Sequence, residues 1–317
     1  MIYYRYFHHV AGLDLLRDEW AQVRALCWSD NTIKTKKSQW KQFFEFCTDY
    51  GLTPLPVEEE TVCLYITHLT KKVGYVTIAN YVSAIWLLHK YMGYIYPNPS
   101  GFVIQSTLTG AKRLLGNATE PALPLTPEDM VAIYRILDMT NIKDLKFWAA
   151  LVLSYRCLLR VSHVTTSAHV MRVKDVEFNS EGMDVIVRSS KTIQFRQRTN
   201  RIPVVKSEAS VLCPVSVLRR YLQVAQKPPG AVMFGYTYNE YSNKFKEMCR
   251  AIGLVGKYTT HSVRRGSASF LASFLPLHDV KTYGDWRSWS VLLYLSDTYS
   301  SRVTKDKMVA SHLQEFA

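Results

Sequence analysis

At 317 residues, the chain is longer than one hydrophobic core usually serves, so two domains of roughly 100 to 200 residues are expected. Its composition, with 48% apolar and 21% charged residues, excludes a disordered or fibrous chain. The net charge of +13 is consistent with a polyanionic partner, because Lys and Arg bind phosphate groups through Coulomb attraction and counterion release.

The first part of the chain is predicted to be a bundle of about four helices. From Asn31 to Gly51, apolar residues recur at the i, i+3, i+4, i+7 spacing of one helical face. Segment 56–72 has acids in its first turn and lysines in its last, and segments 75–93 and 102–117 show similar periodicity. The lysines of the first helix face either DNA phosphates or solvent, and the sequence leaves both open.

A polar segment with three prolines, residues 117–130, is typical of a connection between domains. We therefore place a helical domain at residues 1–120 and a second domain at residues 121–317. The first holds 12 Lys/Arg against 10 Asp/Glu, and the second holds 27 against 16. The basic excess, and with it the expected polyanion contact, lies in the second domain.

The second domain is predicted to be mixed, mainly helical with a small antiparallel sheet. Helices are expected at 145–163 and 214–227, and residues 183–195 and 198–205 have the β-forming composition of two strands. Residues 188–206 contain six Lys/Arg and no acid. A solvated edge strand also carries Lys and Arg, but six uncompensated charges favour a hairpin that faces phosphates.

The C-terminal region holds the most informative group of side chains. His261 and Arg264 are three residues apart, so on a helix they project from one face and can bind the same anion. Alone, this spacing is common on protein surfaces. It gains weight because Arg160 and Lys191 precede it, and a tryptophan and a tyrosine eight residues apart follow it, Trp286 and Tyr294.

Targeting and metal signals are not found. The chain has no run of about 18 uncharged apolar residues, and its start lacks the charged head and apolar centre of a secretory signal. We therefore expect an intracellular protein without a membrane partner. The six cysteines are scattered with no CxxC pair, which predicts reduced core thiols and neither a metal nor another cofactor.

The ordered set resembles the catalytic residues of the tyrosine recombinases, which run Arg, Lys, His-x-x-Arg, His or Trp, and Tyr. The strings LLRVSH, SKTIQFRQR, HSVRRGSASF and GDWRSWSVLLYL are most similar to recombinases of eukaryotic mobile elements, the Crypton and DIRS-like groups. The resemblance covers residues 121–317 well. It implies a catalytic domain there, a helical core-binding domain before it, and a nuclear protein if the source is eukaryotic, otherwise a cytoplasmic one.

The resemblance also implies a role for each residue. Arg160 and Arg264 would bind the non-bridging oxygens of the scissile phosphate, with His261 and Trp286 completing that site. Tyr294 would attack phosphorus and form a 3'-phosphotyrosyl bond, and Lys191 would protonate the leaving 5'-oxygen, with Lys206 as a weaker substitute. Arginine suits this use because it stays charged and offers planar donors, which neutralise the transition state without a metal.

Two departures from the family pattern leave alternatives open. His163 stands where the family often has an acid, three residues after the first arginine, and we expect a core or helix-terminal histidine. Many members separate the tryptophan or histidine from the nucleophile by nine residues, whereas the spacing here is eight. Tyr299 is therefore an alternative nucleophile, and Arg156 is an alternative to Arg160.

The resulting prediction is a site-specific recombinase or integrase that acts on double-stranded DNA, with four protomers exchanging strands. The resemblance also implies that the C-terminal tail, residues 300–316, forms a helix that docks on a neighbouring protomer. A catalytically inactive DNA-binding descendant is the main alternative. Nothing in the sequence favours a third possibility, a relaxing enzyme such as a type IB topoisomerase.

Overall fold

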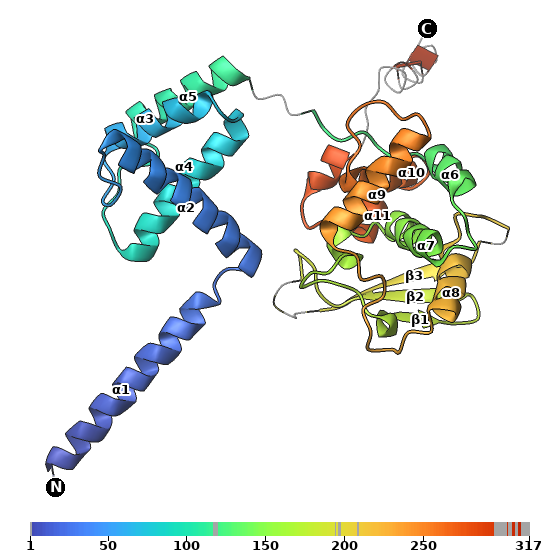
Figure 1. The fold of residues 1–317 in the computed structure, drawn as a ribbon, viewed down its shortest axis with the longest axis horizontal. Helices are drawn as coiled ribbons and strands as arrows, with labels where there is room; N and C mark the ends of the chain where they lie inside the picture. The colour runs from blue at the N-terminus through green and yellow to red at the C-terminus, as the bar shows by residue number, and fades with distance from the viewer. Residues whose placement is uncertain are drawn as a thin grey trace. The chain divides into compact units, whose positions relative to one another are not determined.

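The computed structural model describes residues 2–116, 120–193, 195, 198–207 and 209–294, together with residues 303, 306, 307, 310 and 311. The chain divides into two compact units, an amino-terminal unit of residues 1–119 and a carboxy-terminal unit of residues 120–317. The fold is mainly helical with one small antiparallel sheet, as predicted (Figure 1). Within the described residues, no helix is long and apolar enough to cross a membrane.

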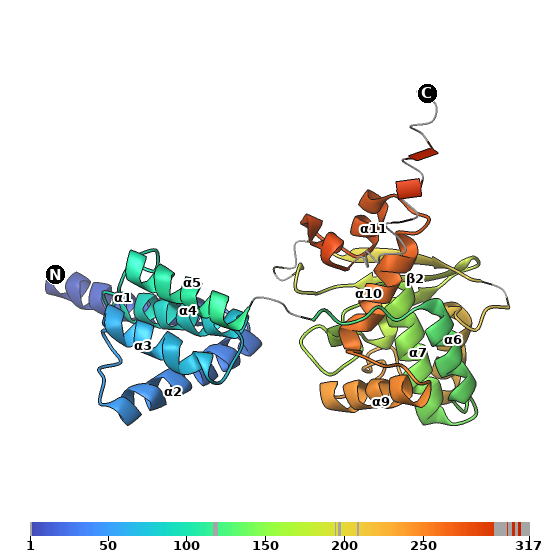
Figure 2. The same cartoon turned by 90° about the horizontal axis from the view of Figure 1, so that it is seen from above.

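Where the structure describes it, the amino-terminal unit has five helices, one more than predicted: α1 (Ile2–Ala25), α2 (Asp30–Tyr50), α3 (Glu59–Thr70), α4 (Tyr75–Met92) and α5 (Phe102–Leu115). The last four pack around a core that includes Phe43, Tyr65 and Ile78 (Figure 2). Helices α2 and α4 end at Gly51 and Gly93, which have the left-handed backbone conformation that glycine adopts at little cost. The unpredicted helix α1 exposes most of its described side chains, and that pattern lacks the apolar stripe of a packed helix.

Within its described residues, the carboxy-terminal unit places a sheet and five helices around the buried helix α7. Its helices are α6 (Pro127–Ile136), α7 (Ile142–Arg156), α8 (Pro214–Ala225), α9 (Tyr238–Ala251), α10 (Thr260–Leu271) and α11 (Leu277–Tyr283). Strands β1 (Val176–Phe178), β2 (Gly182–Val187) and β3 (Asn200–Val205) pair antiparallel in that order. Helix α7 buries a continuous run from Phe147 to Tyr155, with α8 and α10 packed against it.

Helix α6 begins inside the segment that we predicted to be a connection. Thr126 caps the helix by accepting from the Asp129 backbone N–H, and the Asp129 carboxylate accepts from the Thr126 backbone N–H in return. Pro127 occupies the first helical position, where its missing N–H costs nothing. The prolines of segment 117–130 therefore mark a helix start as well as a connection.

Helix α7 ends at Arg156, seven residues before the predicted end at His163. Leu158 has a φ of 48°, a left-handed conformation that a helix cannot contain and that costs energy for a side chain with a Cβ. The chain then continues through Arg160 into the short 3₁₀ helix Val161–His163. This break turns the segment that carries Arg160 away from the helix axis.

The predicted strand 183–195 is also shorter than expected. Strand β2 stops at Val187, and a separate antiparallel bridge joins Ser190 to Ile193. The backbone N–H groups of Ser190 and Ile193 each donate to the carbonyl of the other residue, at 3.3 and 3.0 Å. Lys191 and Thr192 are therefore the two residues of a tight turn, which we call the lysine turn (residues 190–193).

Candidate active site

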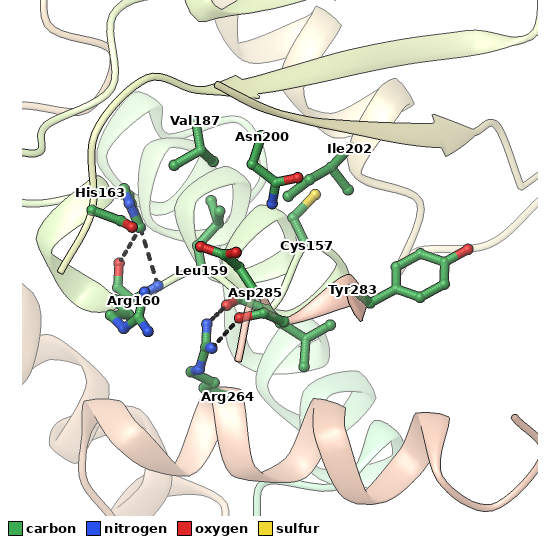
Figure 3. Close-up of a pocket in the computed structure, with 13 residues that line it drawn as sticks. Cys157, Leu159, Arg160, His163, Val187, Asn200, Ile202, Arg264, Tyr283 and Asp285 are labelled. Atoms are coloured by element: carbon green, nitrogen blue, oxygen red, sulfur yellow. Dashed lines mark hydrogen bonds between the residues drawn. The ribbon is translucent and has the colours of Figure 1, made fainter. Parts of the chain in front are cut away.

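Helix α10 places His261 and Arg264 one turn apart, as the spacing predicted. Arg264 is 3% exposed, and its terminal nitrogens donate to the carbonyl oxygens of Leu158 and Gly284 (Figure 3). Its Nε is buried and has no protein hydrogen-bond partner within the described part of the chain. The fold thus fixes a buried positive charge by two carbonyls and leaves N–H capacity for an anion.

The segment after α11 folds back over this arginine. Asp285 has a φ of 54°, and a Cβ at Gly284 would lie 1.6 Å from the Trp286 ring, so only glycine fits there. The Trp286 ring lies 4.1 Å from the Arg264 guanidinium carbon, which is a cation–π contact. Trp286 is buried, and it covers the guanidinium that the two carbonyls orient.

Tyr294 lies at the end of the 3₁₀ helix Trp289–Tyr294, against the side chains named above. Its ring centre is 4.8 Å from that of His261, 5.0 Å from that of Trp286, and 5.8 Å from the Arg264 guanidinium carbon. Helix α10 also holds its backbone, since Arg265 donates to the Leu293 carbonyl at 2.8 Å and Ser269 to the Tyr294 carbonyl at 3.2 Å. The alternative nucleophile, Tyr299, lies outside the described residues.

Arg160 also lies at this cluster. It lines a small cavity together with Arg264, His163 and Asp285 (Figure 3). Its charge acts on both His261 and Arg264. Arg156, the alternative, lies at the end of α7 and lines a different groove with Phe270 and Phe274.

His163 connects the arginine segment to the hairpin. Its Nδ1 accepts from the Arg160 backbone N–H at 3.1 Å, which leaves its Nε2–H to donate to the Ser189 carbonyl at 3.3 Å. Burial, followed by the positive charge of Arg160, lowers the pKa of His163 to about 4, so the ring is neutral at physiological pH. It is a core histidine that joins Arg160 to the residue just before the lysine turn.

The lysine turn contacts the segment that carries Trp286. The Thr192 hydroxyl donates to the Asp285 carboxylate at 2.6 Å, and Arg287 donates to the Thr192 carbonyl at 2.8 Å. Lys191 is exposed beside Thr192, and Lys206 follows the end of β3, where its backbone N–H donates to the Glu181 carbonyl at 2.9 Å. The structure therefore brings five predicted residues into one cluster, and Lys191 lies on a turn attached to that cluster.

The hairpin carries less free charge than the sequence indicated. Arg188 pairs with Asp175 at 2.7 Å, Arg198 pairs with Asp285, and Arg201 pairs with Glu177 and Asp184. These acids lie outside segment 188–206 or across the sheet, so counting charges within the segment missed them. The expectation of six uncompensated charges was wrong for these three arginines.

Electrostatics in the cluster favour binding of an anion. Partial burial and the charges of Arg264, Arg265 and Arg160 lower the pKa of His261, which favours its neutral form. Burial and the charge of Arg160 lower the pKa of Arg264 to about 10, which still leaves it protonated at neutral pH. Asp285 is an acid in the same cavity lining, and Arg198 pairs with it.

A cluster of this composition can bind a phosphodiester and attack it. Two guanidinium groups neutralise the charge that grows on the non-bridging oxygens, and a tyrosine hydroxyl packed beside them is a nucleophile. The sequence did not single out Asp285, Arg287, Arg265 or Ser269. Their partners are backbone carbonyls and a turn hydroxyl distant in sequence, which no local pattern indicates.

Sequence comparison identifies a related protein. No family model matches the chain. The chain is 24% identical over 267 residues to a protein named integrase/recombinase xerD homolog from Selenomonas ruminantium, and the match covers 80% of this chain and 75% of that protein. This relative supports the tyrosine recombinase/integrase family.

Solved structures show the same fold. The integrase of transposon Tn1549, in complex with transposon right end DNA, gives a TM-score of 0.63 at 18% identity over 92% of this chain and 97% of that one. A lambda integrase dimer bound to a COC' core site gives a TM-score of 0.62 at 15% identity, over 89% of this chain and 94% of that one. The fold of this chain is therefore that of the tyrosine recombinases.

Proposed function

We propose that this protein breaks and rejoins DNA strands as a tyrosine recombinase, with Tyr294 as the nucleophile. The observation that carries the proposal is the packing of Tyr294 against His261, Trp286 and the buried Arg264 of its own chain. Packing of a structural tyrosine would not require two arginines at one cavity, yet Arg160 and Arg264 both line it. We propose that Arg160, Arg264, His261 and Trp286 bind the scissile phosphate.

In the proposed reaction, the Tyr294 oxygen attacks phosphorus, a new O–P bond forms, and the bond from phosphorus to the 5'-oxygen breaks. His261 is a suitable acceptor for the tyrosine proton, because its lowered pKa favours the neutral ring and its ring contacts that of Tyr294. Lys191 gives a proton to the leaving 5'-oxygen. The 3'-phosphotyrosyl bond retains the energy of the broken bond, so another 5'-hydroxyl can reverse the step without ATP.

We propose that the partner is double-stranded DNA and that the working form is a tetramer on DNA. Support for DNA comes from the basic excess of the second domain and from similar proteins solved with DNA. The C-terminal tail is proposed to dock on a neighbouring protomer. Deletion of residues 305–317 should then lower the mass of the DNA complex in sedimentation, and an unchanged mass would contradict the proposal.

The biological setting is proposed from the sequence resemblance. The strings LLRVSH and GDWRSWSVLLYL favour a role in integration or transposition of a mobile element of the Crypton or DIRS-like type. In a eukaryotic source such a protein acts in the nucleus, and in a bacterial source in the cytoplasm. Its substrate class in either setting is an element end in duplex DNA.

The test is a DNA duplex nicked so that the 5'-hydroxyl fragment diffuses away after cleavage. The protein should form an adduct that survives denaturation, and mass spectrometry should locate it on Tyr294. Tyr294→Phe should abolish the adduct, whereas Tyr299→Phe should retain it. An adduct on Tyr299 would overturn the assignment of Tyr294 as the nucleophile. Binding to element-end DNA without any adduct would favour the inactive DNA-binding alternative.

A further inference from the structure

The lysine turn is attached to the segment Gly284–Arg287 by side chains from both partners. Asp285 accepts from the Thr192 hydroxyl at 2.6 Å and pairs with Arg198, which lies beyond the turn on the way to β3. One carboxylate therefore holds both arms of the loop that carries Lys191. Burial opposes ionisation of Asp285, but the hydrogen bonds from Thr192 and Arg198 outweigh it and lower its pKa.

A second contact runs in the opposite direction. Arg287 donates to the Thr192 carbonyl at 2.8 Å, so residues on both sides of Trp286 grip the residue next to Lys191. Within the turn, the Ser190 and Thr192 hydroxyls are 2.9 Å apart, which restricts the turn further. The backbone of Asp285 is left-handed at a φ of 54°, a conformation that Asp and Asn tolerate better than most residues.

The same segment is joined to the phosphate-binding arginine. The carbonyl of Gly284 accepts from Arg264, and the Trp286 ring covers the Arg264 guanidinium at 4.1 Å. The four consecutive residues Gly284–Arg287 thus contact the buried Arg264 on one side and the lysine turn on the other. A contact that only stabilised the hairpin could come from any neighbouring segment. This one comes from Asp285, which lies between two residues that contact Arg264, Gly284 and Trp286.

We propose that Asp285 is a positioning residue that fixes the lysine turn against the phosphate-binding cluster, so that Lys191 meets the leaving 5'-oxygen. This inference rests on the proposed function. In the step that it serves, the bond between phosphorus and the 5'-oxygen breaks while a proton passes from the Lys191 ammonium to that oxygen. Arg287 assists by holding the Thr192 carbonyl.

The experiment compares two substrates that differ in one atom. A 5'-bridging phosphorothiolate replaces the leaving oxygen by sulfur, and a thiolate leaves without a proton because a thiol is far more acidic than an alcohol. A variant that has lost only proton donation should be slow on the ordinary phosphodiester and normal on the sulfur substrate. A variant that binds the scissile phosphate poorly should be slow on both substrates.

We expect Asp285→Gly, which accepts the left-handed backbone but lacks the carboxylate, to slow cleavage of the phosphodiester about 10- to 100-fold. Asp285→Asn keeps an acceptor for Thr192 and should show a smaller loss. Both should cleave the phosphorothiolate within about twofold of the wild-type rate, as should Lys191→Ala. The matched control, Glu177→Gln, removes a carboxylate that pairs with Arg201 of β3 and should be normal on both substrates.

The outcomes separate the inference from the proposed function. Equal slowing of Asp285→Gly on both substrates would overturn the positioning role, because the clamp or the fold would then be at fault. No slowing on either substrate would overturn it as well. If the wild-type protein forms no adduct with either DNA, the proposed function fails; if it cleaves both but Asp285→Gly departs from the expected pattern, only this inference fails.

Discussion

The carboxy-terminal unit holds two cations of the proposed active site, Arg264 and Lys191, by different means. Arg264 is buried and is oriented by the backbone carbonyls of Leu158 and Gly284. Lys191 lies on an exposed turn that is held by the side chains of Asp285 and Arg287 through Thr192. The proposed phosphate-binding arginine is therefore part of the folded core, whereas the placement of Lys191, the proposed proton donor, depends on a few surface contacts.

Substitution of Arg264, the proposed phosphate-binding arginine, should give the largest effect. Arg264→Ala should raise the cleavage barrier by about 3 kcal/mol or more, judging from the loss of single oxyanion donors. The variant also leaves two buried carbonyls unpaired, so the free energy of unfolding should fall by about 1–3 kcal/mol for each. Adduct formation at saturating DNA, corrected for the folded fraction by circular dichroism, measures the first effect, and near-normal cleavage would contradict the assignment.

A substitution of His163, which connects Arg160 to Ser189 of the hairpin, should change how stability depends on pH. The folded state keeps His163 neutral down to a pH of about 4, while the unfolded state takes up a proton near pH 6.5. The unfolded state therefore binds more protons in this window, and His163 lowers stability as pH falls, by about 3 kcal/mol in total between pH 7.5 and 4.

His163→Gln does not titrate and keeps a donor for the Ser189 carbonyl. Urea denaturation at pH 7.5, 5.5 and 4.5 should show a flatter decline for this variant than for the wild type. Parallel declines would mean that the folded state does not hold the pKa of His163 below its usual value. His278→Gln is the control, because His278 is an exposed histidine on α11.

Loosening the backbone at Tyr294, the proposed nucleophile, should have an intermediate effect. Arg265→Gln removes the donor to the Leu293 carbonyl and should slow adduct formation about tenfold, since a small misplacement of a reacting group costs rate. DNA affinity at fixed salt should fall much less. If affinity and cleavage fall by the same factor, Arg265 contacts DNA instead of orienting Tyr294.

The smallest effect is expected for an arginine of the hairpin whose charge is already paired. Arg201→Gln should leave the slope of log affinity against log salt unchanged, because Glu177 and Asp184 already neutralise this side chain. Loss of a phosphate contact would reduce the slope by about 1. A reduction of that size would mean that Arg201 leaves its carboxylates to bind DNA.

Much of the architecture was predictable because local patterns determine it. The glycine ends of α2 and α4, the spacing of His261 and Arg264 on α10, and the mixed character of the second part follow from sequence periodicity. The early end of α7 did not follow, because the left-handed backbone of Leu158 depends on its tertiary surroundings. The sequence suggested the cluster only as an ordered set, and it gave no sign of Asp285, whose partners are distant.

The bond from Arg264 to the Leu158 carbonyl has a consequence for the history of such proteins. Leu158 follows the end of α7, so this arginine is also a structural tie between that helix end and α10. In a descendant without catalytic activity, this arginine would still stabilise the fold. Arg264 would therefore be retained for stability, and its presence alone does not separate an active enzyme from an inactive descendant. Tyr294 is the better indicator of activity.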